Sequence, residues 1–529
     1  MKKSILALAL ATLMLLGCAA ALADGDNVLH VYTDRVFRSF DQVTGSDTNL
    51  MDVIGSVSEG LVRLDENHNP QPALAESYTI SEDGLTYTFT LRDGLVWSNG
   101  TPLTAKDFEF SWLTEIGDAD TNGYAKTIAP FIKNGVAYMN GEVDASEVGV
   151  KAVDDKTFVV TLSSPTSFFD RLLTLSCLFP LNEEFYTEQG DAYATDADHL
   201  LYCGPFVATS MDVAVGVTMV KNDQYWDAEN VKLDGVDYKV ITDSSAALNA
   251  YEAGEIDRVN LASTDVLIYQ MDPEFGSYSD FRNYYIQFDY TNENLNAKMR
   301  QAISMAIDRE TLVNDVLMTG AVAAGGVVSQ GIHGTDEQTF REIAGDFSYY
   351  DPDQAKALWD EGVAELGKAP SSLTLLTAEG TDFDDMSVFI QDQLRTVLGL
   401  DVTIKSMTQK ARNEVMKTSN FDMALSAWGA DYDDAMTFLD LWTSDSGYRG
   451  YYGLNTAYSD IIEQVRTETD SAKRLELMVE AEKMLVADDC IVTGIYDRGY
   501  SYLQRDYVKG FIVHPVGQKN EFKYVTIEK

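Results

Sequence analysis

Helical and strand-like patterns alternate through the second half of this chain, and this alternation limits its possible folds more than any other feature. Apolar residues recur every three or four positions in several segments, as on the buried face of an amphipathic helix. Those segments are 296–318, 353–366, 384–398 and 459–486. Shorter strand-like runs lie between them, at 372–376, 401–405 and 421–426. Helices that alternate with strands pack as layers on a sheet, so we predict an α/β fold.

Strand patterns dominate the first half of the chain. In residues 85–91 and 157–162, apolar and polar side chains tend to alternate, as they do in strands with one buried face. Between these runs, Thr104 is followed by Asp107 at the spacing of a helix cap. We therefore predict a helix that begins there and ends at about Ile116.

The N-terminal segment predicts export from the cytoplasm. Lys2 and Lys3 precede a short apolar run, which is the pattern of an export signal and is too short to span a bilayer. The run leads into Leu-Leu-Gly-Cys, which resembles the lipobox of bacterial lipoproteins. We predict that residues 1–17 are removed and that Cys18 is acylated, which anchors the protein extracytoplasmically on the outer face of the cell membrane (the periplasmic side in a Gram-negative cell). The alternative is plain secretion with cleavage after Ala-Leu-Ala at 21–23.

The net charge of the chain limits which partners it can bind, and its length indicates more than one domain. The 84 acidic and 39 basic residues give a formal net charge of −45, and the acids are scattered rather than gathered in a tail. We exclude nucleic acid as a partner, because binding it requires a positive surface. Cationic peptides would instead be attracted. A chain of 529 residues usually forms more than one domain.

Cysteine is scarce in this chain. Besides Cys18 there are only Cys177, Cys203 and Cys490. An exported protein can hold a disulfide, and Cys177 with Cys203 is the preferred pair among three possible pairings. Buried free thiols are the alternative.

The chain carries no recognisable motif of enzymatic chemistry. No histidine is followed by glutamate, and G-x-G, G-x-S-x-G and S-x-x-K are all absent. Residues 118–123 copy half of a calcium loop, but Lys126 and Ala129 occupy its ninth and twelfth positions, so we predict a turn there. We predict neither a metal nor a cofactor. A secreted surface hydrolase stays open as an alternative, because paired carboxylates leave no local signature.

A series of motifs resembles the oligopeptide-binding proteins of bacterial ABC importers, which are extracytoplasmic solute-binding proteins of family 5 (peptide/nickel-binding type). The most extensive match is residues 97–112, WSNGTPLTAKDFEFSW. The others, in chain order, are 59–62 (EGLV), 72–77 (PALAES), 87–92 (YTFTLR), 222–227 (NDQYWD), 251–257 (YEAGEID), 300–309 (RQAISMAIDR) and 428–433 (WGADYD). Ordered motifs over such a length are far more specific than any single one.

This resemblance implies a two-lobed, periplasmic-binding-protein-like (type II) trap with an additional domain on one lobe. The lobes would close on a ligand about a hinge. The implied boundaries are 28–58, 197–283 and 493–529 for lobe I, 59–196 for the extra domain and 284–492 for lobe II. The protein would be a monomer and a binding protein rather than an enzyme, and it would deliver oligopeptides to ABC transporter permease subunits.

The resemblance also implies residues that bind the ligand. A receptor that tolerates any peptide sequence must grip the N-terminal ammonium and the main chain, and a fixed carboxylate suits the ammonium. Asp431 matches the family's ammonium-binding aspartate. Gly429 and Ala430 would present main-chain groups beside it, and Trp428 would pack as a wall.

Further ligand contacts are implied on the opposite lobe. The loop 46–49, with Thr48 and Asn49, matches the segment that pairs with the ligand backbone. Tyr124 and Tyr496 are additional candidates for the lining of the cleft.

The chain differs from the family at the positions that are expected to face the carboxylate of the ligand. Met416 and Leu425 stand where arginines would be sought, and Lys410, Arg412 and Lys417 are the nearest substitutes. Ligand length, and whether the C-terminus is gripped, therefore stay open. The alternatives are a receptor of the same fold for a dipeptide, metal chelate, haem or sugar, the surface hydrolase, and a surface adhesin.

Overall fold

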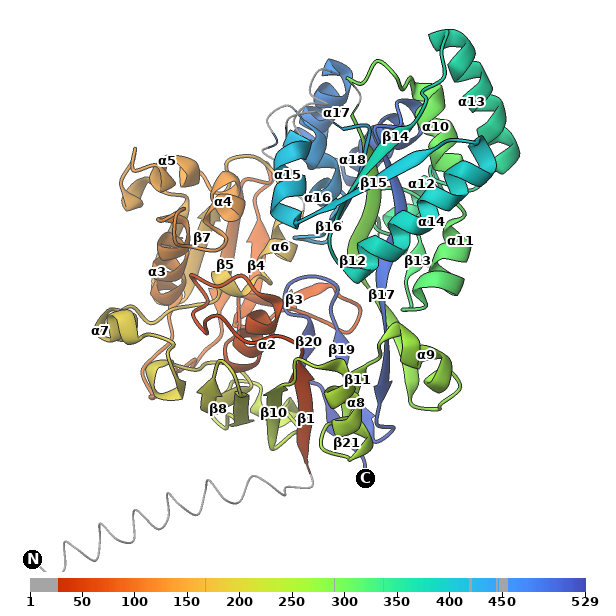
Figure 1. Ribbon diagram of the computed structural model, residues 1–529. Helices are drawn as coiled ribbons and strands as arrows, with labels where there is room; N and C mark the ends of the chain where they lie inside the picture. Colours follow the sequence, from red (N-terminus) through yellow and green to blue (C-terminus); the bar gives the residue numbers. More distant parts are fainter. Residues whose placement is uncertain are drawn as a thin grey trace, which may run out of the picture.

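The protein consists of three packed regions, each with its own sheet and buried core (Figure 1). The structure is a computed structural model that describes residues 27–529 except 167, 290, 336, 418–420, 444–445 and 447–454. The predicted signal sequence and Cys18 lie outside the described residues. Within the described part, no helix is both long and apolar enough to cross a bilayer.

The first region, at the bottom of Figure 1, is built on a four-stranded sheet of order β1-β10-β9-β8. β1 and β10 pair in parallel and the remaining pairs are antiparallel. Leu29 and Val31 of β1 pack with Val53 and Ile54 of helix α2 in the core. The elements are β1 (Val28–Thr33), α2 (Thr48–Val57), β8 (Phe206–Asp212), β9 (Gly216–Lys221), β10 (Gly235–Val240), α8 (Ser244–Glu252) and α9 (Ser263–Tyr269).

The second region, drawn in orange at the left of Figure 1, holds a four-stranded antiparallel sheet of order β4-β5-β7-β6. The strands predicted at 85–91 and 157–162 are confirmed as β5 and β7. The predicted capping box is also confirmed, because Thr104 N donates to Asp107 Oδ2 at 2.7 Å and Lys106 N donates to Thr104 Oγ1. The elements are β4 (Ala75–Ile80), β5 (Thr86–Leu91), α3 (Ala105–Ile116), α4 (Ala125–Ile128), α5 (Gly135–Met139), β6 (Val150–Ala152), β7 (Thr157–Thr161), α6 (Phe169–Leu172) and α7 (Glu183–Gln189).

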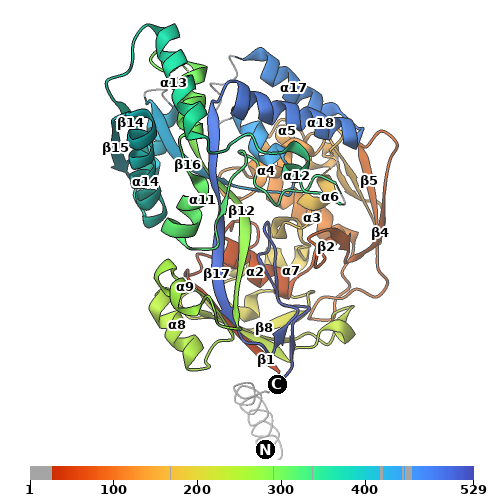
Figure 2. The same ribbon diagram turned by 90° about the vertical axis from the view of Figure 1, so that its right-hand side faces the viewer.

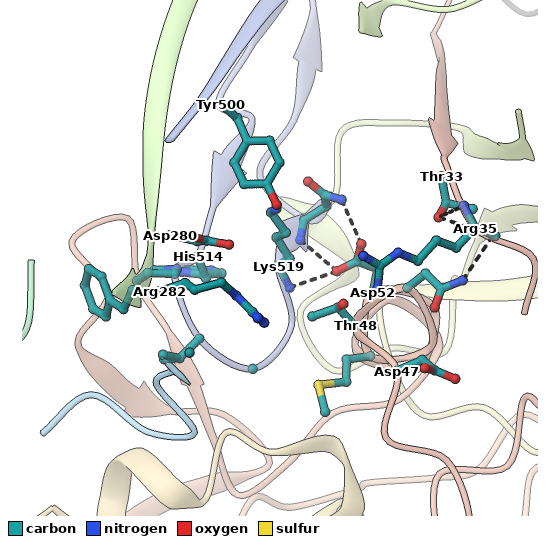
Figure 3. A pocket seen from close by; sticks show the side chains of 18 of the residues that line it. Thr33, Arg35, Asp47, Thr48, Asp52, Asp280, Arg282, Tyr500, His514 and Lys519 are labelled. Atoms are coloured by element: carbon teal, nitrogen blue, oxygen red, sulfur yellow. Dashed lines mark hydrogen bonds between the residues drawn. The ribbon is translucent and has the colours of Figure 1, made fainter. Parts of the chain in front are cut away.

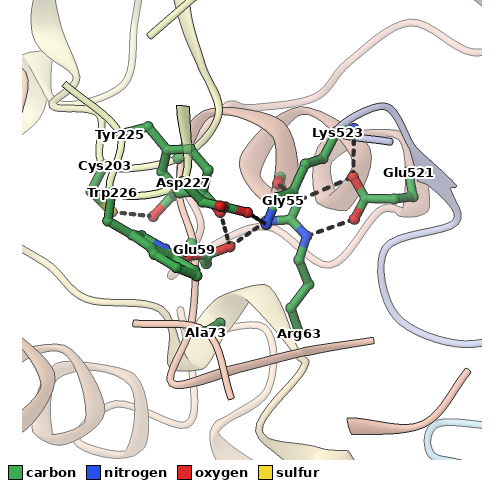
Figure 4. A network of polar contacts seen from close by, with 12 residues as sticks. Gly55, Glu59, Arg63, Ala73, Cys203, Tyr225, Trp226, Asp227, Glu521 and Lys523 are labelled. Carbon is green, nitrogen blue, oxygen red and sulfur yellow. Dashed lines mark hydrogen bonds and ion pairs between the residues drawn. The ribbon is translucent and has the colours of Figure 1, made fainter. Parts of the chain in front are cut away.

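A buried polar network joins the second region to the first (Figure 4). Arg63, between these regions, donates to Glu59 Oε1 and to Glu521 Oε2, both at 2.7 Å. Trp226 Nε1 donates to Glu59 Oε2 at 2.6 Å, so that both carboxylate oxygens of Glu59 are engaged. Buried charges that are paired and fully hydrogen-bonded fix a single packing arrangement, because a shift would leave one of them unpaired.

The third region contains the parallel pair β14 and β15, with β16 beside β14. The three strands predicted at 372–376, 401–405 and 421–426 are confirmed as these elements, and the helices predicted at 353–366 and 384–398 are confirmed as α13 and α14. The elements are α10 (Ala297–Met305), α11 (Arg309–Thr311), α12 (Phe340–Ala344), α13 (Pro352–Leu366), β14 (Leu373–Ala378), α14 (Thr381–Leu398), β15 (Val402–Met407), α15 (Gln409–Lys417), β16 (Met423–Gly429), α16 (Met436–Leu439), α17 (Thr456–Thr467) and α18 (Ser471–Glu482).

Two long helices predicted in this region are each interrupted. The segment 296–318 breaks after α10, where Asp308 caps a new start by accepting from Thr311 N at 3.1 Å. The segment 459–486 breaks between α17 and α18, where Asp470 accepts from Ala472 N and Lys473 N. Both predictions of one continuous helix are wrong, because an aspartate side chain competes for main-chain N–H groups and starts a second helix.

Two strands, β12 (Phe275–Phe288) and β17 (Val492–Gln504), run from the first region into the third (Figure 2). Each is about 40–45 Å long at the usual rise per residue. They pair with each other, and β17 also pairs with the short strands β11 (Arg258–Asn260) and β13 (Val322–Ala323). The register shifts between Ser279 and Asn283, so that residues 280–282 of β12 lie opposite Arg498 alone. Such a bulge bends the strand and redirects its side chains.

The predicted disulfide between Cys177 and Cys203 is wrong. Both residues, and Cys490, are buried free thiols, which was the alternative. The sulfur of Cys203 lies 3.3 Å from Ser58 Oγ instead of facing Cys177. Burial raises the pKa of Cys203 to about 12, so this thiol stays protonated and unreactive.

Candidate functional site

A cavity of about 570 Å³ lies where the three regions meet. This volume is in the usual range for a site that binds a small molecule or a short peptide. Its walls come from the segments 31–35, 46–52, 258–260, 278–282, 429–431, 498–500 and 514–520, together with Tyr124, Leu175 and Gln409. We call this cavity the cleft.

Asp431 enters the cleft just after the end of β16. The main chain there is fixed, because Ala430 N donates to Phe281 O at 2.8 Å and Asp431 N donates to Thr437 Oγ1 at 3.1 Å. Among the described residues, no basic nitrogen lies within 4.0 Å of the Asp431 carboxylate. Burial raises the pKa of Asp431 to about 6, although the nearby Arg282 opposes that shift.

The side chains of the three residues after Asp431 contact other residues of the protein. Tyr432 stacks on Phe168 of the second region, with ring centres 4.6 Å apart. Asp433 accepts from Arg171 Nη1 at 2.8 Å and from His333 N at 2.8 Å. Asp434 receives two hydrogen bonds from Arg474, at 2.7 and 2.9 Å. Of the three aspartates in this loop, only Asp431 therefore offers its carboxylate to the cleft.

The structure brings most of the predicted ligand-binding residues to the cleft. Those that line it are Asp431, Gly429, Ala430, Thr48, Asn49 and Tyr124. The N–H of Ala430 is already taken by Phe281 O, so it is not available to a ligand. Their roles toward a ligand stay a prediction.

Some details of those predictions are wrong. Tyr496 does not line the cleft: it is 2% exposed, and its ring stacks 4.5 Å from that of Tyr284 in the core of the third region. Trp428 packs into the neighbouring core cluster, because side chains alternate between the two faces of β16. Thr48 and Asn49 begin helix α2, so they do not form an extended edge that could pair with a ligand as a strand.

Sequence reasoning missed the charged residues of the two crossing strands. The bulge in β12 brings Asp280 and Arg282 to the cleft, and β17 contributes Arg498 and Tyr500. Arg498 forms an ion pair with Asp280, with Arg498 Nε 3.0 Å from Asp280 Oδ2. A register shift leaves no signature in a single sequence, so only the general position of crossing strands could have been expected.

Sequence reasoning also missed the C-terminal segment, which carries His514 and Lys519 to the cleft (Figure 3). Asp52 of α2 holds this segment by accepting from Lys519 N and Asn520 N, both at 2.8 Å. The ammonium of Lys519 lies 4.0 Å from the centre of the Tyr500 ring. Burial lowers the pKa of Lys519 to about 8.

The substitutes suggested for the missing arginines do not lie at the cleft. Arg412 is buried and donates to Leu425 O at 2.9 Å, and Lys417 pairs with Glu414 on the same helix. Lys410 is exposed, and none of the three lines the cleft.

The half calcium loop at 118–123 forms a turn, as predicted. Asp118 Oδ1 accepts from Asp120 N at 2.9 Å, and Asn122 Nδ2 closes the end of α3 by donating to Thr114 O. Among the described residues, no group of three or more His, Cys, Asp or Glu side chains could hold a metal ion.

Comparisons with a family model, with known sequences and with solved structures all find solute-binding proteins. The family model of bacterial extracellular solute-binding proteins, family 5 Middle, matches residues 69–450. The dipeptide-binding protein DppE of Bacillus subtilis is 31% identical over 502 residues, which cover 94% of this chain and 91% of DppE. The solved structure of Listeria monocytogenes OppA bound to peptide is 33% identical, covers 96% of this chain and 100% of that one, and has a TM-score of 0.74.

A second solved structure bears on how the lobes are arranged. The murein tripeptide-binding protein MppA in its unliganded open form is only 26% identical, yet its TM-score is 0.81 over 95% of this chain and 97% of that one. The present structure thus superposes better overall on the unliganded open form of MppA than on peptide-bound OppA. The fold is the two-lobed α/β fold of type II binding proteins, with an additional domain. The chain is a member of the bacterial extracellular solute-binding proteins of family 5.

Proposed function

We propose that this protein is an extracytoplasmic receptor that captures oligopeptides between its two lobes and delivers them to an ABC permease. Family membership supports the proposal, as do a relative named for dipeptide binding and a related structure with bound peptide. The single observation that carries it is the carboxylate of Asp431, which faces the cleft and has no basic nitrogen within 4.0 Å among the described residues.

The position of Asp431 suits the one positive group that every unmodified peptide shares. A carboxylate held in a partly buried cleft gains a charge-assisted hydrogen bond from the peptide's N-terminal ammonium. Such a bond contributes about 1.5–3 kcal/mol. A sugar or an anionic chelate would bring no positive group to neutralise the Asp431 carboxylate, so its charge would stay uncompensated on closure, which is unfavourable.

The proposal predicts the effect of replacing this carboxylate. Asp431→Asn should weaken binding of a free-amine peptide by about ten- to a hundredfold, because the ammonium loses its charged partner. The same peptide with an acetylated N-terminus should bind the variant and the parent protein alike. Isothermal titration of both peptides against both proteins measures the difference.

A matched control is available in the same cleft. Asp47 also lines the cleft, but its carboxylate already lies 3.6 Å from Arg38 Nε. Asp47→Asn should therefore change the affinity for the free-amine peptide much less than Asp431→Asn does. Equal losses for free and acetylated peptides in Asp431→Asn would sink the proposed role of Asp431.

The proposal also covers the membrane anchor of the receptor and the boundaries of its lobes. We propose that Cys18 is acylated and tethers the protein to the outer face of the membrane, where it works as a monomer. An intact-mass measurement of the purified protein tests the acylation, since an unmodified N-terminus would contradict it.

We also propose lobe boundaries at 58/59, 196/197, 283/284 and 492/493. Ligand capture and lobe closure involve no covalent step, so the proposal includes no enzymatic activity.

A further inference from the structure

The cleft contains positive charges that the proposed ammonium site does not use. Among the described residues that line it, Arg498 is paired with Asp280, and Arg35 lies beside Asp34. Arg258, Arg282 and Lys519 also line the cleft, and none of them has a carboxylate within 4.0 Å among the described residues. Arg258 is held by other groups, because it donates to Gln504 Oε1 at 2.6 Å and lies 3.5 Å from the centre of the Tyr502 ring. In a protein of formal net charge −45, cations without a carboxylate partner in one cleft need an explanation, and Arg282 and Lys519 are the two considered for a ligand.

Arg282 is fixed in place by the bulge of β12. It lies opposite Gly429 of β16, and a Cβ atom on that glycine would come within 3.2 Å of Arg282 Nη2. Its Nε is buried and has no hydrogen-bond partner in the described part of the chain. A buried donor left unsatisfied is unfavourable, so a ligand oxygen that accepted from it would be bound more tightly.

Lys519 is fixed by a different element. Its main chain is held by Asp52 of α2, and its ammonium lies 4.0 Å from the centre of the Tyr500 ring. The side chains of Arg282 and Lys519 are directed into the same cavity (Figure 3). Arg282 belongs to a strand that crosses between lobes, whereas Lys519 belongs to the C-terminal segment.

We propose that Arg282 and Lys519 form a subsite for a carboxylate of the bound peptide, opposite in charge to the subsite at Asp431. This inference rests on the proposed peptide-binding function and names the ligands more closely. Arg282 lies opposite Gly429, two residues before Asp431, and the neighbouring Ala430 N donates to Phe281 O at 2.8 Å, so the two subsites are close together. The receptor therefore favours short peptides, whose ammonium and carboxylate reach both subsites at once.

The experiment compares three peptides by isothermal titration. They are trialanine with a free C-terminus, its C-terminal amide, and the amide of Ala-Ala-Glu, whose only carboxylate is on a side chain. The parent protein should bind trialanine about tenfold or more tightly than its amide, because a charge-assisted hydrogen bond is lost. In Arg282→Met and Lys519→Met, the ratio of the affinity for the free acid to the affinity for the amide should fall toward one.

The Glu-containing amide separates two sources of the carboxylate. If it binds the parent protein as tightly as trialanine does, the subsite accepts a carboxylate from either source. If it binds as weakly as the plain amide, the subsite recognises the C-terminus specifically. Both results support the subsite, provided that Arg282→Met removes the preference.

A control variant tests for long-range electrostatics. Arg395→Met removes the same charge from the exposed face of α14, where Arg395 pairs with Asp392. It should leave the ratio between free acid and amide unchanged. Equal affinity of the parent protein for trialanine and its amide would overturn the inference. The proposed function would survive that result if acetylation of the N-terminus still weakened binding, and would fail with it if acetylation had no effect.

Discussion

Asp431 combines a partly buried carboxylate with the lack of a basic partner among the described residues. Burial disfavours its carboxylate, and no basic group within 4.0 Å compensates among the described residues. Its two neighbours in the loop, Asp433 and Asp434, are engaged by Arg171 and Arg474. The loop thus has two paired aspartates that hold its shape and one aspartate with no basic partner among the described residues, which we propose binds the ligand.

The pKa of Asp431, raised to about 6, predicts how affinity depends on pH. Only the ionised carboxylate pairs with an ammonium, so affinity for a free-amine peptide should level off near pH 7. It should fall at pH 8, because the peptide's own ammonium, with an ordinary pKa of about 7.7–8.0, and Lys519, with a pKa of about 8, then lose their protons. It should also fall below about pH 6, by about tenfold per pH unit, as the free protein takes up a proton. Titrations at pH 5, 6, 7 and 8 measure this.

The acetylated peptide and the Asp431→Asn variant serve as references for that profile. Both should give flat profiles between pH 5 and 7, since neither combination has an ammonium facing an ionisable Asp431. An identical decline for the acetylated peptide would show that another group controls the pH dependence.

Sequence reasoning found some cleft residues and missed others for a physical reason. Asp431 was identified because it lies in a contiguous motif, WGADYD, whose spacing is visible in one chain. Arg282 and Lys519 were missed because each reaches the cleft through long-range pairing: a register shift between two strands for Arg282, and hydrogen bonds to Asp52 for Lys519. Tyr496 was misplaced because an isolated tyrosine on a strand gives no sign of which side it faces.

At the scale of elements, the second region supports the loop that carries Asp431. Helix α6 supplies Arg171, and the adjacent Phe168 stacks on Tyr432 at an interplanar angle of 2°. Arg474 lies 5.3 Å from the centre of the Phe168 ring, so aromatic and charged contacts share one small interface. The loop between β16 and α16 is therefore held from the second region as well as from its own.

This interface predicts the effect of Arg171→Met on stability. The side chains of Arg171 and Asp433 are only 12% and 9% exposed, so the substitution leaves a nearly buried carboxylate unpaired. We expect a loss of about 2–4 kcal/mol in the free energy of unfolding at pH 8. Urea denaturation of the variant and the parent protein measures it.

The loss should depend on pH in a defined direction. Burial raises the pKa of Asp433 to about 6 in the folded protein, above its usual value of 3.8, although Arg171 opposes the shift. The ion pair contributes only while Asp433 is ionised, so the loss should be smaller at pH 5 than at pH 8. Adding Asp433→Asn to the variant should recover part of the stability at pH 8. A loss that was equal at both pH values would contradict the ion-pair explanation.

Elements were predicted well where the pattern was local and poorly where a single side chain decided the outcome. β14, β15 and β16 follow from short apolar runs, and the capping box at Thr104 follows from its spacing. The interruptions at Asp308 and Asp470 were missed because apolar periodicity continues across them. An aspartate inside a periodic segment was the available signal, since its side chain favours a helix start over a helix interior.

At the scale of the whole molecule, β12 and β17 are the strands that connect the lobes. The chain superposes better on the unliganded open form of MppA than on peptide-bound OppA, despite lower sequence identity. Under the proposed function, the lobes would approach each other when a ligand enters. Rotation about a few residues of crossing segments is the usual form of such closure.

Closure predicts a change in overall dimensions. Saturation with a free-amine tripeptide should reduce the radius of gyration measured by small-angle X-ray scattering, because the lobes draw together around the ligand. Asp431→Asn should show the same reduction only at higher peptide concentrations. A radius that stayed constant at saturation would mean that peptide binds without closure.

The cleft draws its walls from residues as far apart in the chain as Val31 and Asn520. No N-terminal fragment that stops short of Lys519 can therefore contain a complete binding site, however well its own sheets have formed. Contacts so distant in sequence form late in folding. A ligand stabilises only the states that bind it, so a peptide that needs the whole cleft stabilises this chain only when both crossing strands and the C-terminal segment are in place.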